Sequence, residues 1–361
     1  MIATNSARSP RFIAFYLPQF YPTPYNDEWW GKGFTEWTAV ARARPRFRGH
    51  YQPHLPADLG FYDLRLPEVR EAQADLARQH GVYGFCYYHY WFNGRRLLER
   101  PLDAILELGK PDYPFCICWA NENWTRTWDG LARNILIEQH YSEEDDFAHI
   151  RHLIPILEDR RYIRIEGKPL VLLYRVEVLP DAQKTAERWR TETQKAGLGD
   201  IFLMNVENNS IRTPRDPGTF GFDASVRFQP SGYSFRYSKF ARRLQRLRRP
   251  QLTDTVYPYR DLYRFWEADP PARYRRFDCV TPMWDNSARR KKGAFMLRDS
   301  TPADYEAWLR ESVKRAQPDG EGHRWVFINA WNEWGEGCHL EPCQKWGRAY
   351  LEATKRAYDN S

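Results

Sequence analysis

WVFINAWNEWGEGCHLEP, residues Trp325–Pro342, begins apolar and then becomes polar. The run Val326–Ile328 has strand character and favours burial. Glu333 and Glu336 follow three residues apart, and this spacing puts two side chains on opposite faces of a continuing strand. A turn or bulge at Gly335 would aim both carboxylates into one pocket, because glycine adopts backbone conformations that other residues avoid. The alternative is a plain strand end whose acids face water and whose tryptophans belong to the core or its rim.

Eight short β-rich runs divide the chain, and the run described above is the last of them. Helical patterns lie between most of these runs, which predicts an α/β fold, a (β/α)8 TIM barrel with extended loops at the C-terminal face of the strands. An open doubly wound sheet is the alternative, weakened because the sequence has no Gly-rich dinucleotide fingerprint and no phosphate loop. The predicted strands are Phe12–Leu17, Tyr83–Tyr88, Phe115–Trp119, Pro169–Tyr174, Ile201–Asn205, Ala224–Phe228, Cys279–Trp284 and Val326–Ala330. The predicted helices are Pro67–His80, Leu97–Leu108, Glu143–Glu158, Ala182–Ala196, Pro302–Ala316 and Gln344–Tyr358.

We expect a single catalytic domain over residues 1–361, with long loops at 18–66 and 229–277. The hydrophobic content of 42% allows a sizeable core, and no apolar stretch approaches transmembrane length. The N-terminal MIATNSARSPRF lacks the apolar centre of a secretory signal, so we expect a cytoplasmic chain, with peripheral cell-envelope association left open. Six cysteines in so long a chain do not form a disulfide framework, and Cys116 and Cys118 are expected to be buried core thiols.

Charge and aromatic content bear on the partner. The net charge of +7 permits acidic partners but names none. The basic runs RRLQRLRR at 242–249 and ARRKK at 288–292 could steer an anionic polysaccharide, a sugar nucleotide diphosphate or a phospholipid-linked glycan, whereas a solvated face is the usual role of such runs. Aromatic residues make up 16% of the chain, and planar amphipathic rings suit the apolar faces of sugars. We expect a carbohydrate partner, no nucleic acid, no integral membrane segment, no cofactor and no metal, and the oligomeric state stays open.

Polar and aromatic residues gather where the predicted strands end. In a TIM barrel these ends lie on one face, which carries the catalytic groups. We therefore expect one site built from these ends and from the loop after the first strand, although His89 could equally be structural. The candidate substrate-binding residues are Tyr16, Gln19, Glu36, Trp37, His89, Trp91, Asn121, Glu122, Trp124, Glu207, Trp284, Asp285, Trp331, Asn332 and Trp334.

Cleaving a glycosidic bond requires one acid that protonates the leaving oxygen and a second carboxylate that assists at the anomeric carbon. Three pairings meet this requirement. Glu333 can pair with Glu336, Glu122 can pair with Glu333 across the barrel, or Glu207 can supply one member. The second pairing is similar to barrel glycosidases that place an Asn-Glu acid on one strand and a nucleophile on another.

Several long motifs occur in order: FYLPQFYP at 15–22, NDEWWGKGFTEW at 26–37, GHYQPHLP at 49–56, GFCYYHYWF at 84–92, WANENWTRTWDG at 119–130 and AWNEWGEGCHLEP at 330–342. Together they resemble the WbsX-like proteins of bacterial polysaccharide gene clusters, which are related to glycoside hydrolase family 99, the endo-α-mannosidases. The resemblance spans most of the chain and is weakest over residues 231–276. It implies a (β/α)8 barrel and a glycan role in the cytoplasm or the cell envelope.

The resemblance also implies roles for the two glutamates, because family 99 enzymes are retaining and use two of them after the last strand. Glu333 matches the base that acts on the substrate's own 2-hydroxyl, which attacks the anomeric carbon to give an anhydro sugar. Glu336 matches the acid/base at the leaving group. The implied function is a retaining glycoside hydrolase or transglycosylase for a cell-surface or exopolysaccharide glycan, with endo action on a mannoside as one form. The alternatives are a glycosyltransferase of O-antigen synthesis, for which the sequence shows no DxD-like site, and a non-catalytic glycan-binding barrel.

Overall fold

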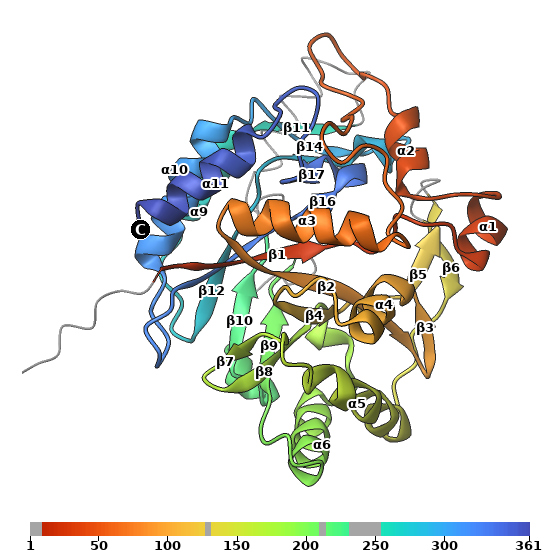
Figure 1. Ribbon diagram of the computed structural model, residues 1–361, viewed down its shortest axis with the longest axis vertical. Coiled ribbons are helices and arrows are strands. Elements are labelled where there is room, and N and C mark those ends of the chain that lie inside the picture. The colour runs from red at the N-terminus through yellow and green to blue at the C-terminus, as the bar shows by residue number, and fades with distance from the viewer. Residues whose placement is uncertain (1–8, 127–130, 209–213, 231–253) are drawn as a thin grey trace, which may run out of the picture.

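The computed structural model describes residues 9–126, 131–208, 214–230 and 254–361 (Figure 1). Within these residues the barrel strands are β1 (Arg11–Tyr16), β2 (Val82–Phe92), β4 (Phe115–Trp119), β8 (Lys168–Leu173), β9 (Phe202–Val206), β10 (Ala224–Arg227), β12 (Arg276–Val280) and β15 (Trp325–Ile328). Each strand pairs in parallel with its neighbours, and β1 pairs with both β2 and β15, which closes the barrel. The predicted TIM barrel is confirmed, and the open sheet is excluded.

Helices surround the barrel, with α10 and α11 packed together on one flank and α5 and α6 on another (Figure 1). They are α3 (Pro67–Gln79), α4 (Arg100–Leu108), α5 (Glu143–Leu157), α6 (Ala182–Lys195), α9 (Tyr259–Glu267), α10 (Pro302–Arg315) and α11 (Ala349–Asp359). In the described residues between β9 and β10 the connection contains the short 3-10 helix η3 (Pro217–Phe220). Among the described helices, none combines the length and apolarity needed to cross a bilayer.

Local sequence chemistry accounts for the helix starts. Ser142, Asp181 and Thr301 precede α5, α6 and α10, and each accepts a hydrogen bond from the backbone N–H three residues later. Pro67 and Pro302 occupy the first turns of α3 and α10, where the missing N–H costs nothing. The helix boundaries therefore follow from capping residues that are visible in the sequence.

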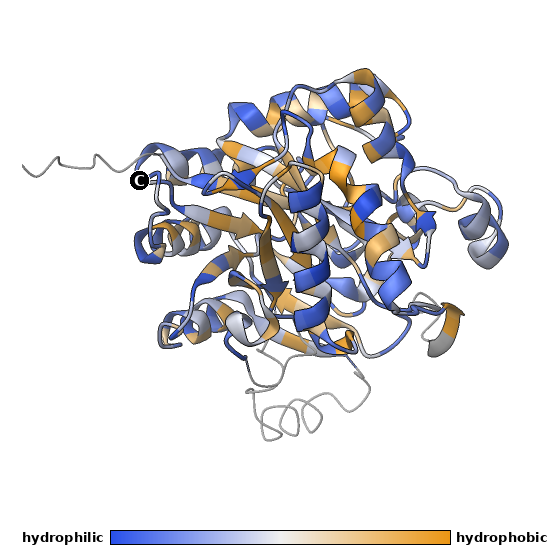
Figure 2. Cartoon of the chain, turned by 90° about the horizontal axis from the view of Figure 1, so that it is seen from below, coloured by the Kyte–Doolittle hydropathy of each residue, from blue (hydrophilic) through white to orange (hydrophobic). Residues whose placement is uncertain are grey.

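Side chains alternate in direction along the strands, so one set fills the lumen of the barrel and the other set packs beneath the helices. The Phe15 ring faces the lumen, with its centroid 5.1 Å from that of Phe228 and 5.8 Å from that of Phe327. The neighbouring Tyr16 points outward, is fully buried, and donates its hydroxyl to Gln73 of α3 at 2.7 Å. Figure 2 shows hydrophobic residues concentrated on the central strands, while the surrounding helices present hydrophilic faces outward.

Several segments differ from the sequence-based prediction; the last helix, for example, begins at Ala349 and not at Gln344. The strand predicted to end at Tyr88 continues to Phe92. The seventh strand is Arg276–Val280 and stops before Pro282, because a proline cannot donate to a central ladder. The loop after the first strand contains two short helices, α1 (Pro24–Trp30) and α2 (Glu36–Arg42), although its sequence shows no sustained period. The basic run at 242–249 lies outside the described residues.

Short strands build a second layer over the carboxyl ends of the barrel strands, in the loops that follow them. They are β3 (Arg95–Leu97), β5 (Trp124–Arg126) with β6 (Leu131–Ile137), β11 (Thr255–Pro258) with β14 (Phe295–Arg298) and β13 (Trp284–Asp285), and β16 (Asn332–Glu333) with β17 (Cys338–His339). At the opposite end, β7 (Arg164–Ile165) pairs with the start of β8. The extended loops are thus concentrated on the C-terminal face, as predicted.

Two asparagines fasten this upper layer to the barrel. Asn332 accepts from the Leu17 N–H at 2.7 Å and donates to the Leu17 carbonyl at 3.0 Å, across the β1–β15 seam. Asn121 makes the same pair of bonds with the backbone of Arg175, at 2.8 Å each. A primary amide has one donor side and one acceptor side, so it satisfies a buried N–H and C=O together. Each asparagine therefore fixes the direction in which its following glutamate leaves the barrel.

We predict that Asn332→Ala lowers the free energy of unfolding by about 1–3 kcal/mol, because it leaves the buried backbone groups of Leu17 without partners. Urea denaturation followed by tryptophan fluorescence and circular dichroism measures this change. Asn360→Ala is the matched control, since Asn360 is exposed at the end of α11. Equal stability of the two variants would contradict the role assigned to Asn332.

Candidate active site

One guanidinium, that of Arg289, binds three carboxylates. Its Nη2 lies 2.7 Å from Glu36 Oε1 and 2.6 Å from Glu333 Oε2, and its Nη1 lies 3.1 Å from Glu336 Oε1. A guanidinium presents five N–H donors in a planar fork, so it can hold several acids in one fixed arrangement. We call these four residues the carboxylate cluster. The two predicted catalytic glutamates are thus neighbours on one cation.

Segments far apart in the chain supply the cluster. Glu36 begins α2 and is fully buried, and its N–H donates to the Gln19 carbonyl at 3.1 Å. Arg289 follows the 3-10 helix η4 (Asn286–Ala288), in the loop after β12. Glu333 ends β16, and Glu336 ends the adjoining 3-10 helix η5 (Trp334–Glu336). The cluster therefore joins the loops after β1, β12 and β15.

The turn predicted at Gly335 exists, but the structure gives a different reason for the glycine. The left-handed residue is Gly337, with φ of 53°, whereas Gly335 is not in that region. The Gly335 N–H donates to Glu36 Oε1 at 2.8 Å. A Cβ at this position would overlap Glu36 Oε1 and lie 2.8 Å from Arg289 Nε. Gly335 is thus required because the buried carboxylate of Glu36 occupies the space of its side chain.

Burial and mutual repulsion perturb the ionisation of the cluster. Burial raises the pKa of Glu333 to about 8, with Arg289 acting against the shift and the carboxylates of Glu336 and Glu36 adding to it. Burial likewise raises the pKa of Glu36, again against Arg289. Burial alone would lower the pKa of Arg289, but the three carboxylates outweigh it and raise that pKa well above its usual value. The cluster therefore combines a permanent cation with a carboxyl group that can exchange a proton near neutral pH.

A fourth acid, Glu341, holds the tryptophan that lies between the two glutamates. Its carboxylate accepts hydrogen bonds from Trp334 Nε1 at 2.6 Å, Gln73 Nε2 at 2.6 Å and the Tyr62 hydroxyl at 2.8 Å. Burial raises the pKa of Glu341 to about 7, while these donors favour its ionised form. The Trp334 ring also stacks on His339, with centroids 3.8 Å apart. Trp334 is therefore a structural support of the turn and does not face the mouth.

Tyrosines of β2 face the mouth of the barrel and were not predicted. Burial raises the pKa of both Tyr88 and Tyr90, and in each the Glu333 carboxylate is the next largest cause, which places both hydroxyls within electrostatic reach of the cluster. The Tyr90 ring lies 5.1 Å from the Trp124 ring. Trp124 was predicted to bind substrate and is half-buried on this side. The signal that could have identified the tyrosines is the alternation of an eleven-residue strand.

The intervening residues of β2 point the other way. His89 Nε2 lies 3.0 Å from His149 Nε2, and Trp91 donates to Asp145 at 2.8 Å, so both contact α5 outside the barrel. The sequence placed them after the strand, whereas the strand continues past them and alternation turns them outward. The structure does not bring His89 or Trp91 to the cluster.

Other predicted residues are also buried away from the mouth. Tyr16 lies beneath α3, as described above. Trp37 donates to the Tyr62 carbonyl at 2.8 Å, and its ring lies 5.4 Å from that of Trp334. Trp331 is fully buried, with its ring 5.0 Å from that of Phe85. These aromatic residues build the support under the site.

Glu207 is directed away from the cluster. It accepts a hydrogen bond from the Tyr274 hydroxyl at 2.6 Å, and Arg276 Nη1 lies 3.8 Å from its other oxygen. Burial raises the pKa of Glu207. Its partners lie at the amino end of β12, whereas the cluster lies beyond the carboxyl end of β15. The geometry does not bring Glu207 to either Glu333 or Glu336.

Glu122 does lie at the mouth, but in a different setting. Its carboxylate is paired with Arg175 Nη1 at 2.5 Å, and its side chain is 45% exposed. Burial raises the pKa of Tyr174, and the carboxylates of Glu122, Glu336 and Glu333 add to this shift, so all three acids lie within electrostatic reach of one tyrosine. Glu122 is therefore a solvated and neutralised acid across the mouth from the cluster.

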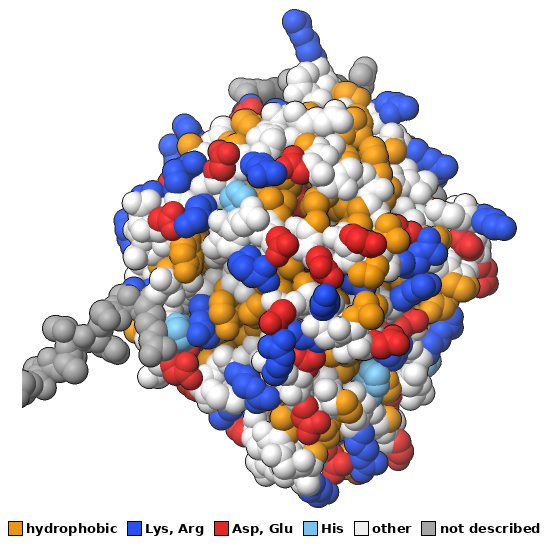
Figure 3. All heavy atoms as spheres, viewed as in Figure 1, with side chains coloured by type: hydrophobic (Ala, Val, Ile, Leu, Met, Phe, Trp, Pro, Cys, Tyr) orange, Lys and Arg blue, Asp and Glu red, His pale blue; other side chains and the backbone are white. Residues whose placement is uncertain are grey.

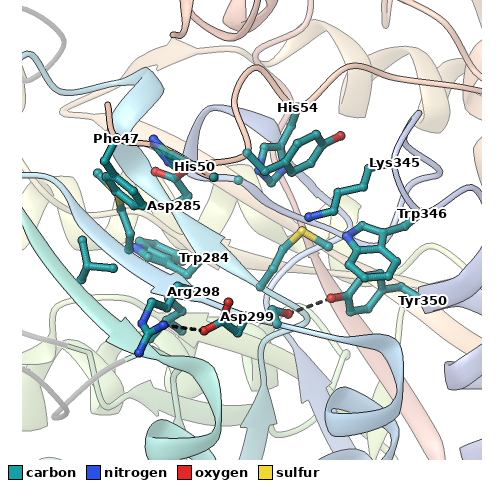
Figure 4. A pocket seen from close by; sticks show the side chains of 18 residues that line it. Phe47, His50, His54, Trp284, Asp285, Arg298, Asp299, Lys345, Trp346 and Tyr350 are labelled. Carbon is teal, nitrogen blue, oxygen red and sulfur yellow. Dashed lines mark hydrogen bonds and ion pairs between the residues drawn. The ribbon is translucent and has the colours of Figure 1, made fainter. Parts of the chain in front are cut away.

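Trp284 and Asp285 line a cavity of about 140 Å³ beside the turn that carries Glu333 and Glu336 (Figure 4). His50 Nε2 donates to Asp285 Oδ2 at 2.6 Å, and Gln52 Nε2 donates to the same atom at 2.8 Å. Burial acts to raise the pKa of Asp285, but the hydrogen bond from His50 helps to bring it below the usual value. Gly337 of the turn also lines the cavity. Among the described residues, no group of three or more His, Cys, Asp or Glu is arranged to hold a metal ion.

A profile of the family described as glycosyltransferase WbsX matches residues 12–354. Two curated relatives, both described as uncharacterized protein WxcX, come from Xanthomonas campestris pv. campestris strains B100 and ATCC 33913, and each is 45% identical. The alignments cover 96% and 99% of this chain but 49% and 50% of the relatives. The chain thus spans about half the length of the curated relatives that it matches.

Solved structures with the same fold include the GH99 endo-alpha-mannosidase from Bacteroides thetaiotaomicron, with a TM-score of 0.57, 16% identity and 97% of each chain covered. A protein described as glycoside hydrolase-like has a TM-score of 0.59 and 13% identity, and the match covers 97% of this chain and 94% of that chain. At these identities the likeness shows a shared barrel architecture and nothing finer.

We predict that Gly335→Ala lowers the free energy of unfolding by about 1–3 kcal/mol, the usual cost of inserting a methyl group into a packed site. The added carbon must displace the Glu36 carboxylate or the Arg289 guanidinium. Gly320→Ala is the control, because a Cβ at Gly320 meets no atom within 4 Å. Denaturation midpoints of the two variants measure the difference, and a wild-type midpoint for Gly335→Ala would show that the close approach is not needed.

The raised pKa of Glu333 predicts a pH-dependent stability. Between an unfolded pKa of about 4.3 and a folded pKa of about 8, the folded chain holds a proton that the unfolded chain has lost. The free energy of unfolding therefore falls as pH rises across this window, by at most about 1.4 kcal/mol per pH unit from this group. Glu333→Gln has no carboxyl group to ionise at this position, so its free energy of unfolding should fall less steeply with pH.

Thermal midpoints measured between about pH 5 and pH 8 test this slope. Glu122→Gln is the control, because it removes a carboxylate that lies outside the carboxylate cluster and leaves Glu333 in place. Parallel curves for Glu333→Gln and wild type would contradict the perturbed ionisation of Glu333.

Proposed function

The chain belongs to the family described as glycosyltransferase WbsX, and we propose that it cleaves or transfers a glycosidic bond of a bacterial surface polysaccharide. Glu333 and Glu336 are the reacting carboxylates in this proposal. The observation that carries it is their convergence on one guanidinium at the carboxyl end of the last barrel strand. Two carboxyl groups at one site are the minimum set for acid and base catalysis at an anomeric centre.

The first step forms an anhydro sugar. Glu333 takes the proton of the substrate's 2-hydroxyl while that oxygen attacks the anomeric carbon. Glu336 gives its proton to the glycosidic oxygen, whose bond to the anomeric carbon breaks. The bond from the 2-oxygen to the anomeric carbon forms, and the bond from the glycosidic oxygen to that carbon breaks. Glu333 gains one proton and Glu336 loses one, so the number of protons is unchanged.

The second step reverses these roles. Water attacks the anomeric carbon and gives its proton to Glu336, while the 2-oxygen leaves that carbon and recovers a proton from Glu333. Two inversions give net retention of configuration. If a sugar hydroxyl replaces water, the same chemistry transfers the glycan, and the family description favours this second outcome.

The setting of each acid supports its role. Glu333 is buried and its pKa is raised to about 8, so it holds a proton below that pH, and its ionised form, which the first step requires, is a strong proton acceptor. The Glu336 side chain is 24% exposed, which leaves it accessible to a leaving group and to water. Arg289 keeps the pair together through both steps, because it stays charged whichever glutamate holds a proton.

The geometry favours this pair over the rival pairings. Glu122 forms an ion pair with Arg175 and its side chain is 45% exposed, which suits contact with a sugar hydroxyl better than proton transfer. Glu207 is bound to Tyr274 and Arg276. A purely binding barrel would gain nothing from three acids crowded on one cation, because such crowding is costly. The half-buried Tyr88, Tyr90 and Trp124 supply ring faces for sugars, and the cavity at Trp284 and Asp285 supplies a further subsite.

Incubation with a panel of bacterial polysaccharides, with mass spectrometry of released or transferred units, tests the function. We predict that Glu336→Gln and Glu333→Gln each lower turnover by about 10²- to 10⁴-fold, the usual contribution of a general acid or base. Thermal midpoints close to wild type show that the fold is intact.

Glu122→Gln serves as the matched carboxylate at the same mouth and should change turnover only a few-fold. Near wild-type turnover in Glu336→Gln, or a loss in Glu122→Gln as large as that in Glu336→Gln, would overturn the assignment of the acid.

A further inference from the structure

A groove of about 510 Å³ lies beside the carboxylate cluster, between α1, α2 and the segment that follows η4. Two indoles, of Trp29 and Trp30, form part of its wall. Among the described lining residues there are five cations and no Asp or Glu. The lining cations are Arg42, Arg44, Arg46, Arg290 and Lys291.

Hydrogen bonds and an ion pair hold the two sides of the groove together. Arg46 binds Asp254 with two bonds of 2.8 Å and donates to the Ser287 carbonyl at 2.8 Å, which joins the α2 side of the groove to the η4 side. Arg42 and Arg290 are exposed, and neither has a carboxylate partner within the part of the chain that the structure describes. Cations that line a concave surface without opposing acids concentrate anions there.

The groove shares its walls with the carboxylate cluster. Arg289 of the cluster lies in sequence between Ala288 and Arg290, which both line the groove. Glu36 begins α2, and the same helix contributes Arg42 to the groove. Figure 3 shows Lys and Arg side chains along the upper right edge of the molecule, over α1 and α2. An anion in the groove therefore lies against α2 and the segment after η4, the two segments that supply Glu36 and Arg289 to the carboxylate cluster.

A row of aromatic rings connects the two places. Tyr90 lies within electrostatic reach of Glu333, as described above, and its ring lies 5.1 Å from that of Trp124. The Trp124 ring lies 6.3 Å from that of Trp29, which lines the groove. Successive rings at such spacing offer apolar faces to successive sugars. The row gives a glycan chain a path from the cluster to the groove.

We propose that the groove binds acidic groups, carboxylate or phosphate, carried by the glycan next to the bond that reacts. This inference rests on the proposed function, because it names the substrate class as an anionic glycan. The run ARRKK at 288–292 then has two roles: Arg289 organises the carboxylates, and the following cations bind the anion. Neutral glycans of the same length bind more weakly, since they offer no charge to Arg42 and Arg290.

Isothermal titration calorimetry on the full chain carrying Glu336→Gln tests the proposal without turnover. The probes are trigalacturonic acid for carboxylates, inorganic pyrophosphate for phosphates, and mannotriose as the neutral trisaccharide. We expect at least one anionic probe to bind more tightly than mannotriose, and its affinity to fall with added salt. The probe that binds identifies the source of the acidic group.

In that background, Arg42→Gln/Arg290→Gln should weaken the anionic probe about tenfold or more, because it removes two cations from the groove. Arg78→Gln/Lys110→Gln is the control with the same change in charge, at the opposite end of the barrel. Trp29→Ala should weaken trigalacturonic acid and leave pyrophosphate binding unchanged if the ring contacts sugar.

The proposal is overturned if neither anion binds, if mannotriose binds as tightly as the tighter of the two anionic probes, or if the groove variant and the control lose equal affinity. Failure of the proposed function looks different. In that case the anion still binds in the groove, while the wild-type chain converts no polysaccharide of the panel.

Discussion

The contact of Arg289 with three carboxylates is the interaction on which the candidate site depends. Glu36, Glu333 and Glu336 lie so close together that without a cation each would have to take up a proton or move apart. One planar guanidinium removes that conflict and also fixes the direction of each acid. Gly335 permits the approach, because its missing side chain leaves room for the Glu36 carboxylate. A packing constraint and an electrostatic constraint thus meet at one turn, and the fold places that turn at the barrel mouth.

Much of this architecture could be predicted from the sequence, because local and global signals agree. Eight β-rich runs alternate with capped helices, and such alternation has few solutions other than a parallel barrel. The convergence of Glu333 and Glu336 also followed from local reasoning, since two acids that must not alternate require a turn between them. The cause assigned to Gly335 was different in the structure, because a close approach from residue 36 cannot be seen in a local pattern.

The parts that could not be predicted depend on partners distant in sequence. Arg289 lies in a basic run whose usual role is to face solvent, and only the folded chain shows its three acid partners. The strand β2 continues to Phe92, and its alternation points His89 outward and Tyr90 inward. The sequence-based prediction ended this strand at Tyr88 and placed His89 in the site. Successive side chains of a strand point to opposite faces, so a strand predicted too short assigns the wrong residues to the site.

In the proposed mechanism, Glu333 acts on the substrate's own 2-hydroxyl while Glu336 acts at the leaving group. The most direct measurement compares the cleavage rate of a glycan found in the polysaccharide panel with that of the same glycan lacking the 2-hydroxyl on the reacting sugar. We expect the wild-type chain to cleave the first and not the second, because no anhydro sugar can form from the 2-deoxy glycan. Efficient cleavage of the 2-deoxy glycan would contradict it and would point to direct attack by a carboxylate.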